Sequence, residues 1–316
     1  MSLTLMQIGM NTADLPGSLD LFSEAFGFRN AGGQLISGDI IQLQGLDRTS
    51  RALMWWLVGA QPRLQFEFFH HTQPAQRPLR ADWTPADLGW SRFGIAVAAF
   101  DHAVSELAKR GIAPIAGEAT VEGLRRMAYR DPFIGVVVEV MEDGPALRNL
   151  AGRTGGPALV YVAASVSDLG AARTYYEDVL GLPIATANPI HPPGSDALWG
   201  LPKARTEAIV VNAGGVFLEI AHYASPEGRP RMADYRASDQ GIVNVALGAA
   251  HRAPVEAAFA RLAAAGYRPP FLVDAGEMLA GYITEPEREV EFVVIPPPLE
   301  AALGFAPVSP FLGSRR

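Results

Sequence analysis

The sequence predicts an α+β fold built from four β-α-β-β-β units in two tandem halves. Four polar positions on predicted strands of the first half recur in the second half, 152 to 154 residues later. The two sets are Gln7, Glu67, Arg92 and Glu139, then Tyr161, Glu219, Asn244 and Glu291. The pair Asp14-Leu15, which opens a predicted helix, likewise matches Asp168-Leu169. Such self-similarity indicates a duplicated architecture.

Helical periodicity and apolar runs justify the individual elements. Apolar residues recur at helical spacing over residues 16–26, 101–110, 170–180 and 254–265. Strand-like runs in the first half cover residues 40–44, 53–57, 64–69 and 136–140. These runs leave no room for crossover helices, which excludes a single parallel sheet. The turn-rich stretch 152–157 predicts a linker between domains at 1–148 and 157–297, followed by a tail at 298–316.

The bulk composition excludes several classes of protein. The 316 residues are 49% hydrophobic, which is enough apolar material for about two domain cores. A net charge of -7 without a basic cluster argues against a nucleic-acid partner, and no apolar run approaches the ~18 residues of a membrane span. Cysteine is absent, so thiolate chemistry is excluded and a cytoplasmic location is expected. The expected partner is a small molecule, and a homodimer stays open.

Alternation along the strands assigns the eight polar positions to one face. Met6, Ile8 and Met10 are apolar and should lie under the first helix, which places Gln7 on the opposite face. The same reasoning puts the other seven positions on the face away from their helices. Small neighbours on that face leave room for a ligand: Gly94, Ala96, Ala246 and Gly248.

Four stretches of this chain resemble the vicinal oxygen chelate superfamily of glyoxalases, methylmalonyl-CoA epimerases, extradiol dioxygenases and bleomycin-resistance proteins. The stretches cover residues 7–15, 131–140, 161–169 and 217–220. The resemblance implies tandem glyoxalase-like domains, each with two βαβββ modules that form a curled sheet cup with helices outside. It also implies metal ligands on the first, fourth, fifth and eighth strands, which are the positions identified above.

The ligand set departs from that family pattern. Extradiol cleavage, as the resemblance implies it, needs two imidazoles and a carboxylate for Fe(II), but Tyr161 and Asn244 stand at the imidazole positions. Ring cleavage is therefore disfavoured. In the first half, Gln7, Glu67 and Glu139 could supply oxygen ligands, whereas the Arg92 guanidinium has no lone pair to donate.

Two interpretations of the first half follow from these charges. In one, Arg92 lies between Glu67 and Glu139 and the ion pairs are purely structural. In the other, Arg92 binds a substrate oxygen and either Glu67 or Glu139 acts as the base.

The second half has the opposite charge balance. No cation on its strands offsets Glu219 and Glu291, so the sequence predicts either a hard cation such as Mg²⁺ or Mn²⁺ or one protonated carboxyl group. A one-residue slip of the last strand would turn Phe292 inward instead of Glu291.

The function expected from the resemblance is lyase or isomerase chemistry by proton abstraction next to a carbonyl group. The residues assigned to catalysis are Glu67, Glu139 and Arg92. The residues assigned to substrate binding are Gln7, Tyr161, Glu219, Asn244 and Glu291. No cofactor is firmly assigned, and a divalent metal in the second cup would use Glu219 and Glu291. The alternative is a non-catalytic protein of bleomycin-resistance type that binds or sequesters a small molecule.

Overall fold

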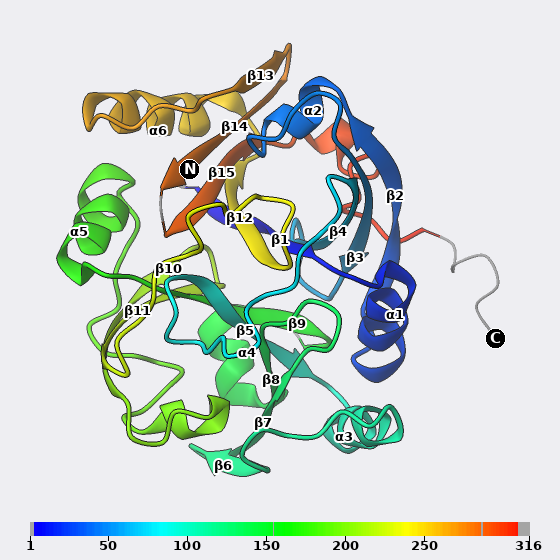
Figure 1. The fold of residues 1–316 in the computed structure, drawn as a ribbon, viewed down its shortest axis with the longest axis vertical. Helices are drawn as coiled ribbons and strands as arrows, with labels where there is room; N and C mark the ends of the chain where they lie inside the picture. Colours follow the sequence, from blue (N-terminus) through cyan, green and yellow to red (C-terminus); the bar gives the residue numbers. More distant parts are fainter. Residues whose placement is uncertain (1–2, 154, 286, 309–316) are drawn as a thin grey trace.

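Four successive modules, each opening with a strand and a helix, make up the chain (Figure 1). This computed structural model describes residues 3–153, 155–285 and 287–308. The predicted tail residues 309–316 therefore lie outside the described residues. The helices that begin at Leu15 and Leu169 are each capped by the preceding aspartate. Asp14 accepts a hydrogen bond from the Gly17 backbone amide, and Asp168 accepts one from the Ala171 backbone amide.

The four modules have these bounds. The first contains β1 (Thr4–Asn11), α1 (Leu15–Asp20) continued by a π-helical turn (Leu21–Ala25), β2 (Arg29–Ser37), α2 (Asp39–Gln42), β3 (Arg51–Val58) and β4 (Gln65–Gln73). The second contains β5 (Gly89–Val97), α3 (Phe100–Lys109), β6 (Ala119–Val121), β7 (Leu124–Arg130) and β8 (Val137–Glu142), followed by α4 (Pro145–Ala151).

The second half repeats this order with one change. The third module contains β9 (Ala158–Ser165), α5 (Leu169–Arg173) continued by a π-helical turn (Thr174–Val179), a 3₁₀ turn (Ser195–Trp199), β10 (Arg205–Asn212) and β11 (Phe217–Ser225). The fourth contains β12 (Gly241–Ala249), α6 (Arg252–Ala264), β13 (Leu272–Ala275), β14 (Met278–Glu285) and β15 (Arg288–Val294), followed by a 3₁₀ turn (Pro297–Leu299). In the third module a single bridge, Ile184 to Val211, stands in place of the strand after the helix.

The modules pair into two sheets across the predicted halves. The order β13-β14-β15-β12-β1-β4-β3-β2 joins modules four and one, and the order β10-β11-β9-β5-β8-β7-β6 joins modules three and two. The expected fold of curled βαβββ cups is confirmed, but the expectation that each half forms its own cup is wrong. Antiparallel pairing of β1 with β12 and of β5 with β9 builds the cups instead. The division into domains at 1–148 and 157–297 stays a prediction.

One predicted strand is a helix. Residues 40–44 were expected to be extended, but Asp39–Gln42 form α2 and the strand ends earlier, at Ser37. Ile41 explains the difference, because its side chain is fully buried and packs in a cluster with the inward-facing Met54 and Trp56 of β3. This tertiary contact outweighs the weak strand propensity of a short apolar run.

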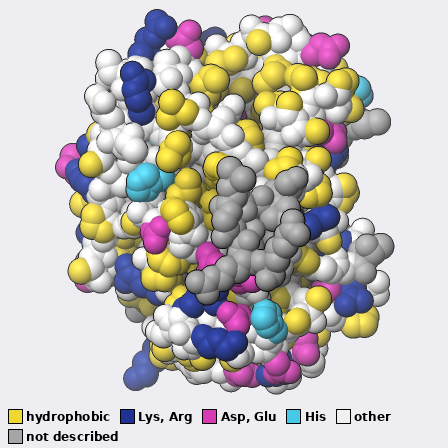
Figure 2. Space-filling view, turned by 90° about the vertical axis from the view of Figure 1, so that its right-hand side faces the viewer, with side chains coloured by type: hydrophobic (Ala, Val, Ile, Leu, Met, Phe, Trp, Pro, Cys, Tyr) yellow, Lys and Arg dark blue, Asp and Glu magenta, His cyan; other side chains and the backbone are white. Residues whose placement is uncertain are grey.

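The surface of the protein carries mixed charges. On the face shown in Figure 2, basic and acidic side chains are interspersed. Within the described residues, no helix is both long enough and apolar enough to cross a membrane.

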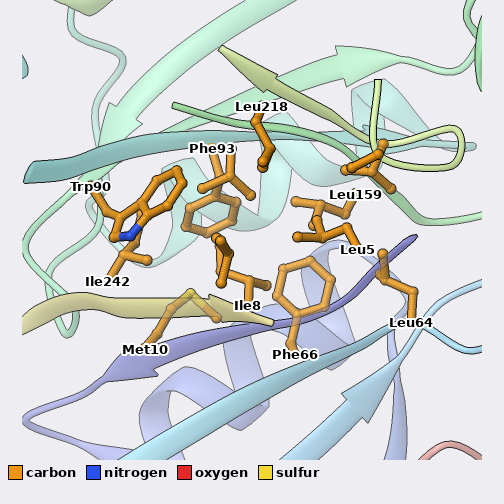
Figure 3. Packing of buried hydrophobic residues seen from close by; sticks show 14 of the residues in the cluster. Leu5, Ile8, Met10, Leu64, Phe66, Trp90, Phe93, Leu159, Leu218 and Ile242 are labelled. Atoms are coloured by element: carbon orange, nitrogen blue, oxygen red, sulfur yellow. The ribbon is translucent and has the colours of Figure 1, made fainter. Parts of the chain in front are cut away.

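The main core lies where the two sheets face each other. Apolar residues of both sheets point into this space, among them Ile8 and Phe66 from one sheet and Phe93 and Leu218 from the other (Figure 3). Successive side chains of a strand alternate between faces. The polar neighbours of these residues, such as Gln7 and Glu67, therefore lie on the opposite, cup-facing side, as the sequence predicted.

Candidate functional site

The structure sorts the eight polar positions into two groups of four. The terminal cup, made by modules one and four, holds Gln7 on β1, Glu67 on β4, Asn244 on β12 and Glu291 on β15. The central cup, made by modules two and three, holds the remaining four: Arg92 on β5, Glu139 on β8, Tyr161 on β9 and Glu219 on β11. All eight side chains are buried.

This grouping corrects the expected contacts of Arg92. The Arg92 guanidinium donates from Nη2 to Glu219 Oε2 at 2.6 Å, and it lies 4.1 Å from the centre of the Trp199 ring. It does not lie between Glu67 and Glu139, because β5 pairs with β9 of the third module rather than with a strand of the first. The prediction that no cation offsets Glu219 is wrong for the same reason.

A histidine lies at the centre of the central cup. His191 Nε2 is 2.9 Å from Glu139 Oε2, and His191 Nδ1 is 2.9 Å from Glu219 Oε2. Burial alone would lower the pKa of His191, but the facing carboxylates Glu219 and Glu139 outweigh burial and raise it to about 9. Imidazolium is therefore the form present at neutral pH.

Further hydrogen-bond donors contact the two carboxylates of the central cup, Glu139 and Glu219. Tyr161 donates its hydroxyl to Glu139 at 2.7 Å, and Arg126 donates to Glu139 at 3.3 Å. Asn188 donates its amide to Glu219 at 2.7 Å. Burial would raise the pKa of Glu219, but His191 and Arg92 hold it well below its usual range. A carboxylate held in this way is a poor base at neutral pH.

The carboxyl groups of the terminal cup are in a different electrostatic environment. Among the described residues, no Lys, Arg or His forms an ion pair with Glu67 or Glu291. Burial raises the pKa of Glu67 to about 7, and burial together with the charge of Glu67 raises the pKa of Glu291 to about 8. The expected effect of two facing carboxyl groups is therefore present, but Glu67, not Glu219, is the partner of Glu291. The last strand is not slipped, because Phe292 packs against Phe259 of α6.

The side-chain amides of Gln7 and Asn244, together with the indole of Trp56, complete the floor of the terminal cup. Trp56 Nε1 donates to Glu67 Oε1 at 2.9 Å, and Asn244 Nδ2 donates to Glu291 Oε2 at 3.2 Å. The amide oxygens Gln7 Oε1 and Asn244 Oδ1 are buried and have no hydrogen-bond partner among the described residues. The floor therefore offers two carboxyl groups and two unpaired amide oxygens.

Glycine at position 9 creates the space that Asn244 occupies. A Cβ atom on Gly9 would lie 2.2 Å from Asn244 Oδ1. The equivalent glycine of the central cup is Gly94, where a Cβ atom would lie 2.2 Å from Tyr161 Cε1. Each cup thus depends on one missing side chain to seat a polar group from the neighbouring module.

A divalent cation, which the fold family implies, fits only one of the cups. Four oxygen donors without a competing cation among the described residues suit a hard ion such as Mg²⁺ or Mn²⁺ in the terminal cup. In the central cup, His191 and the guanidinium groups of Arg92 and Arg126 already neutralise both carboxylates. The pairing of Glu219 with Glu291 in one metal site is therefore wrong, since the two residues belong to different sheets.

The two cups differ in access. The C-terminal segment covers part of the terminal cup, because Leu303 and Phe305 pack on a cluster that includes Met6 and Tyr282. A cavity of about 1050 Å³ adjoins the central cup and is lined by Arg92, His191, Trp199 and Glu219, among others.

Sequence reasoning missed His191, Asn188 and Arg126. The first two lie in the irregular loop between Ile184 and β10, where no periodicity assigns a face. Arg126 lies on β7 opposite Met141 of the adjacent strand β8, and its side chain donates to Glu139, two residues from Met141 on that strand. Alternation on β7 could have placed Arg126 on the cup face.

Comparisons with known proteins agree with this fold. Residues 158–291 match the family model of the glyoxalase/bleomycin resistance protein/dioxygenase superfamily. A putative dioxygenase from Bacillus subtilis is similar at a TM-score of 0.63 and 15% identity, with 98% of this chain and 92% of that chain covered. Glyoxalase I from Zea mays is similar at a TM-score of 0.56 and 15% identity, with 93% of this chain and 92% of that chain covered. No curated protein matches the chain.

Proposed function

We propose that the terminal cup is an active site in a chain that belongs, over residues 158–291, to the glyoxalase/bleomycin resistance protein/dioxygenase superfamily. The fold of the whole chain is similar to that of solved structures from this superfamily. The substrate of the terminal cup is a small organic molecule with carbonyl or vicinal oxygens, and the reaction moves a proton at the carbon next to the carbonyl group. This is lyase or isomerase chemistry. The observation that carries the proposal is the buried pair Glu67 and Glu291, which has no cation beside it among the described residues.

The acid–base properties of the pair suit proton transfer at neutral pH. The pKa of Glu67 is raised to about 7 and the pKa of Glu291 to about 8. Between these two pH values the pair therefore holds about one proton, so that one carboxyl group is ionised and the other is protonated. A general base and a general acid work best with pKa values near the operating pH. We assign the base to Glu67, whose ionised form accepts the Trp56 N–H, and the acid that returns the proton to Glu291.

Hydrogen bonds hold the two carboxyl groups in position. Trp56 fixes one oxygen of Glu67, and Asn244 fixes one oxygen of Glu291. Because both donors come from strands within the sheet, the two carboxyl groups are held in fixed positions before any substrate binds. The covering segment near Leu303 would keep water from the reacting carbon.

The same floor can hold a divalent cation. Gln7, Asn244 and the ionised carboxylates of Glu67 and Glu291 would be its ligands, and the cation would then take the place of the proton that the carboxyl pair holds without it. A bound cation would supply positive charge that stabilises an oxyanion next to the carbon that loses its proton.

Solvent deuterium exchange tests the chemistry directly. The protein is incubated in D₂O with the hemithioacetal of methylglyoxal and glutathione, and separately with acetoin, and deuterium at the carbon next to the carbonyl is followed by NMR. Exchange should occur with the native chain and fall by about 10²–10⁴-fold in Glu67→Gln, which removes the base. The exposed Glu256→Gln variant is the control and should retain the native rate. Exchange that persists unchanged in Glu67→Gln would exclude this residue as the base.

Calorimetric titration of Mn²⁺ tests the cation. Binding to metal-free protein should be lost in Glu67→Gln and kept in Glu219→Gln, because only Glu67 lies in the terminal cup. The opposite pattern would move the cation site to the central cup.

One observation favours a second function, the binding of a small molecule without reaction. The cavity of about 1050 Å³ lies over the central cup, whose carboxylates already bond to His191, Arg92 and Tyr161. A floor neutralised in this way can recognise a ligand but has no free base. Equilibrium dialysis against the same carbonyl compounds, with Trp199→Ala as the cavity variant, separates this function from catalysis.

A further inference from the structure

The third module has a loop where the other modules have a strand after the helix. Only Ile184 bridges to β10, at Val211, and the chain then leaves the sheet until β10 begins at Arg205. The loop turns into the central cup and carries His191, which is 6% exposed. In this module a loop that places His191 at the centre of the central cup therefore stands where the other modules have a strand.

A set of hydrogen bonds fixes this loop in position. Asn188 accepts from the amides of Ile190 and His191, both at 2.9 Å, while its own amide donates to Glu219. From the second module, Arg126 donates to the Ile190 carbonyl at 3.0 Å. The tight turn at Asn188 therefore aims the imidazole between the two carboxylates.

The imidazole ring uses both of its nitrogens. One nitrogen bonds to Glu139 of the second module and the other to Glu219 of the third, each at 2.9 Å. Both acceptors are carboxylates, so both ring nitrogens must donate, and only imidazolium has two N–H groups. The ring is also enclosed edge-on by Tyr161, at 4.7 Å between ring centres, and by Trp199, at 5.1 Å.

We propose that the central cup is a binding site for an organic cation with two opposed N–H donors, filled in this chain by its own His191, and that it is not a metal site. The terminal cup has the same strand framework, but among the described residues no inserted side chain bridges Glu67 and Glu291. The two cups therefore differ, because only in the central cup does a described side chain place an imidazole between the two carboxyl groups. This inference does not depend on the proposed reaction.

The geometry explains why a metal ion does not fit the central cup. An ion bound between Glu139 and Glu219 would need the volume that the ring fills, and it would lie near the guanidinium groups of Arg92 and Arg126. Those two groups stay in place when the ring is removed. Together they balance the charge of the two carboxylates, so a divalent ion would leave two excess positive charges in this buried site, whereas imidazolium leaves one and spreads it over two hydrogen bonds to carboxylates.

Removal of the ring should create a site that external imidazole fills. His191→Gly should lower the Tm by about 5 °C, because Glu139 and Glu219 lose their shared donor. Imidazole should restore the Tm in a concentration-dependent manner, as expected for a ligand that binds only the folded state. The probe 1-methylimidazole should restore much less, since its cation has one N–H group and cannot bridge both carboxylates. Mn²⁺ should not restore the Tm.

A matched control and the contrary outcomes make the test decisive. His251→Gly removes an exposed imidazole at the start of α6 whose side chain caps no amide, so imidazole should leave its Tm unchanged. Equal rescue by imidazole and 1-methylimidazole would overturn the two-donor site. Rescue by Mn²⁺ would overturn the exclusion of metal.

A measurement on the native chain covers the case in which His191→Gly does not fold. ¹⁵N NMR at pH 7.5 should show both nitrogens of His191 protonated, and Mn²⁺ should not broaden these signals beyond the broadening seen for His222. A neutral ring, or selective broadening of the His191 signals, would contradict the proposal.

Discussion

Arg77 and Arg229 make reciprocal contacts between the two segments that connect the sheets. Arg77 Nε donates to Asp239 Oδ1 at 2.9 Å, and Arg229 Nε donates to Asp87 Oδ1 at 2.8 Å. Each arginine also bonds to a second aspartate of the opposite connector, in one case Asp234 and in the other Asp82. The two connectors, residues 74–88 and 226–240, are thereby held together by two equivalent sets of ion pairs at the crossing between the sheets.

Loss of either arginine should destabilise the native state. Asp87 and Asp239 are buried, at 4% and 3% exposed, so removal of an arginine leaves a buried carboxylate with fewer donors. Arg77→Gln and Arg229→Gln should each lower the Tm measured by calorimetry. The decrease in Tm of the double variant should be smaller than the sum of the two single decreases, because both sets of ion pairs join the same two connectors.

Arg48→Gln is the control for these variants. Its ion pair with Asp39 is exposed, at 65% and 61% of the side chains, and such pairs contribute little to stability. A Tm loss in Arg48→Gln that equals the loss in Arg77→Gln would show that the burial of the aspartates is not the cause.

The connectors also show how much of the structure the internal repeat of the sequence can predict. Arg77, Asp82 and Asp87 recur as Arg229, Asp234 and Asp239, each 152 residues later, so the repeat could have been extended to these segments. The repeat does establish four similar modules and the cup-facing side of the eight polar positions. The expected place of Met6 under the first helix is wrong, because a register shift in β1 between Leu5 and Gln7 turns Met6 towards Tyr282 on the side of the terminal cup. The repeat does not establish which modules share a sheet, because β1 has the same alternation whether it pairs with β12 or with β5.

That ambiguity explains why the site residues were grouped incorrectly. The eight cup positions were identified from alternation, and all eight are buried on the two cup floors. Their division into groups of four follows from the edge pairings of whole modules, β1 with β12 and β5 with β9, which the alternation within a single strand does not specify. The place of His191 in the central cup could not be predicted for another reason, since an irregular loop has no periodicity that would show to which side its side chains point.

The stability of the protein should fall as pH rises through the titration of the terminal cup. The folded-state pKa values of Glu67 and Glu291, about 7 and about 8, lie above the ordinary value of 4.5. The native state therefore holds more protons than the unfolded state between these limits, and the free energy of unfolding decreases as these protons are lost. Glu291→Gln, which cannot ionise, should be more stable than the native chain at pH 8 by on the order of 2 kcal/mol.

Urea unfolding at a series of pH values from 5 to 9, with EDTA present, measures this effect. EDTA is needed because a bound cation would favour the ionised carboxylates and oppose the trend. The gain in Glu291→Gln should shrink as the pH falls towards 5, because the pH then approaches the ordinary pKa of 4.5 of the unfolded carboxyl group and the two states hold more nearly the same number of protons. A constant gain at every pH would point to packing rather than to ionisation.

Arg92 and Glu219 should be energetically coupled. Arg92→Met should destabilise the protein by about 3 kcal/mol, because it leaves Glu219 buried without its guanidinium partner. Glu219→Gln in the same chain should lessen that loss, since the uncompensated charge is then absent. A double-mutant cycle by urea unfolding should give a coupling energy on the order of 1–3 kcal/mol. Additive losses would mean that the pair contributes nothing beyond its separate contacts.

Gly9→Ala should disable the terminal cup while the fold persists. The added methyl group would lie 2.2 Å from Asn244 Oδ1, so the Asn244 side chain must turn away from the floor and release Glu291. Mn²⁺ affinity, measured by calorimetry, should fall by at least about tenfold, because the loss of one ligand and of the hydrogen bond to another weakens a metal site. Gly170→Ala in α5 is the matched control, since Gly170 is exposed and its added methyl group would meet only Asp168 Oδ1, at 3.2 Å. If Gly9→Ala is folded and binds Mn²⁺ as tightly as the native chain, Asn244 is not a ligand and the floor of the terminal cup does not hold the cation.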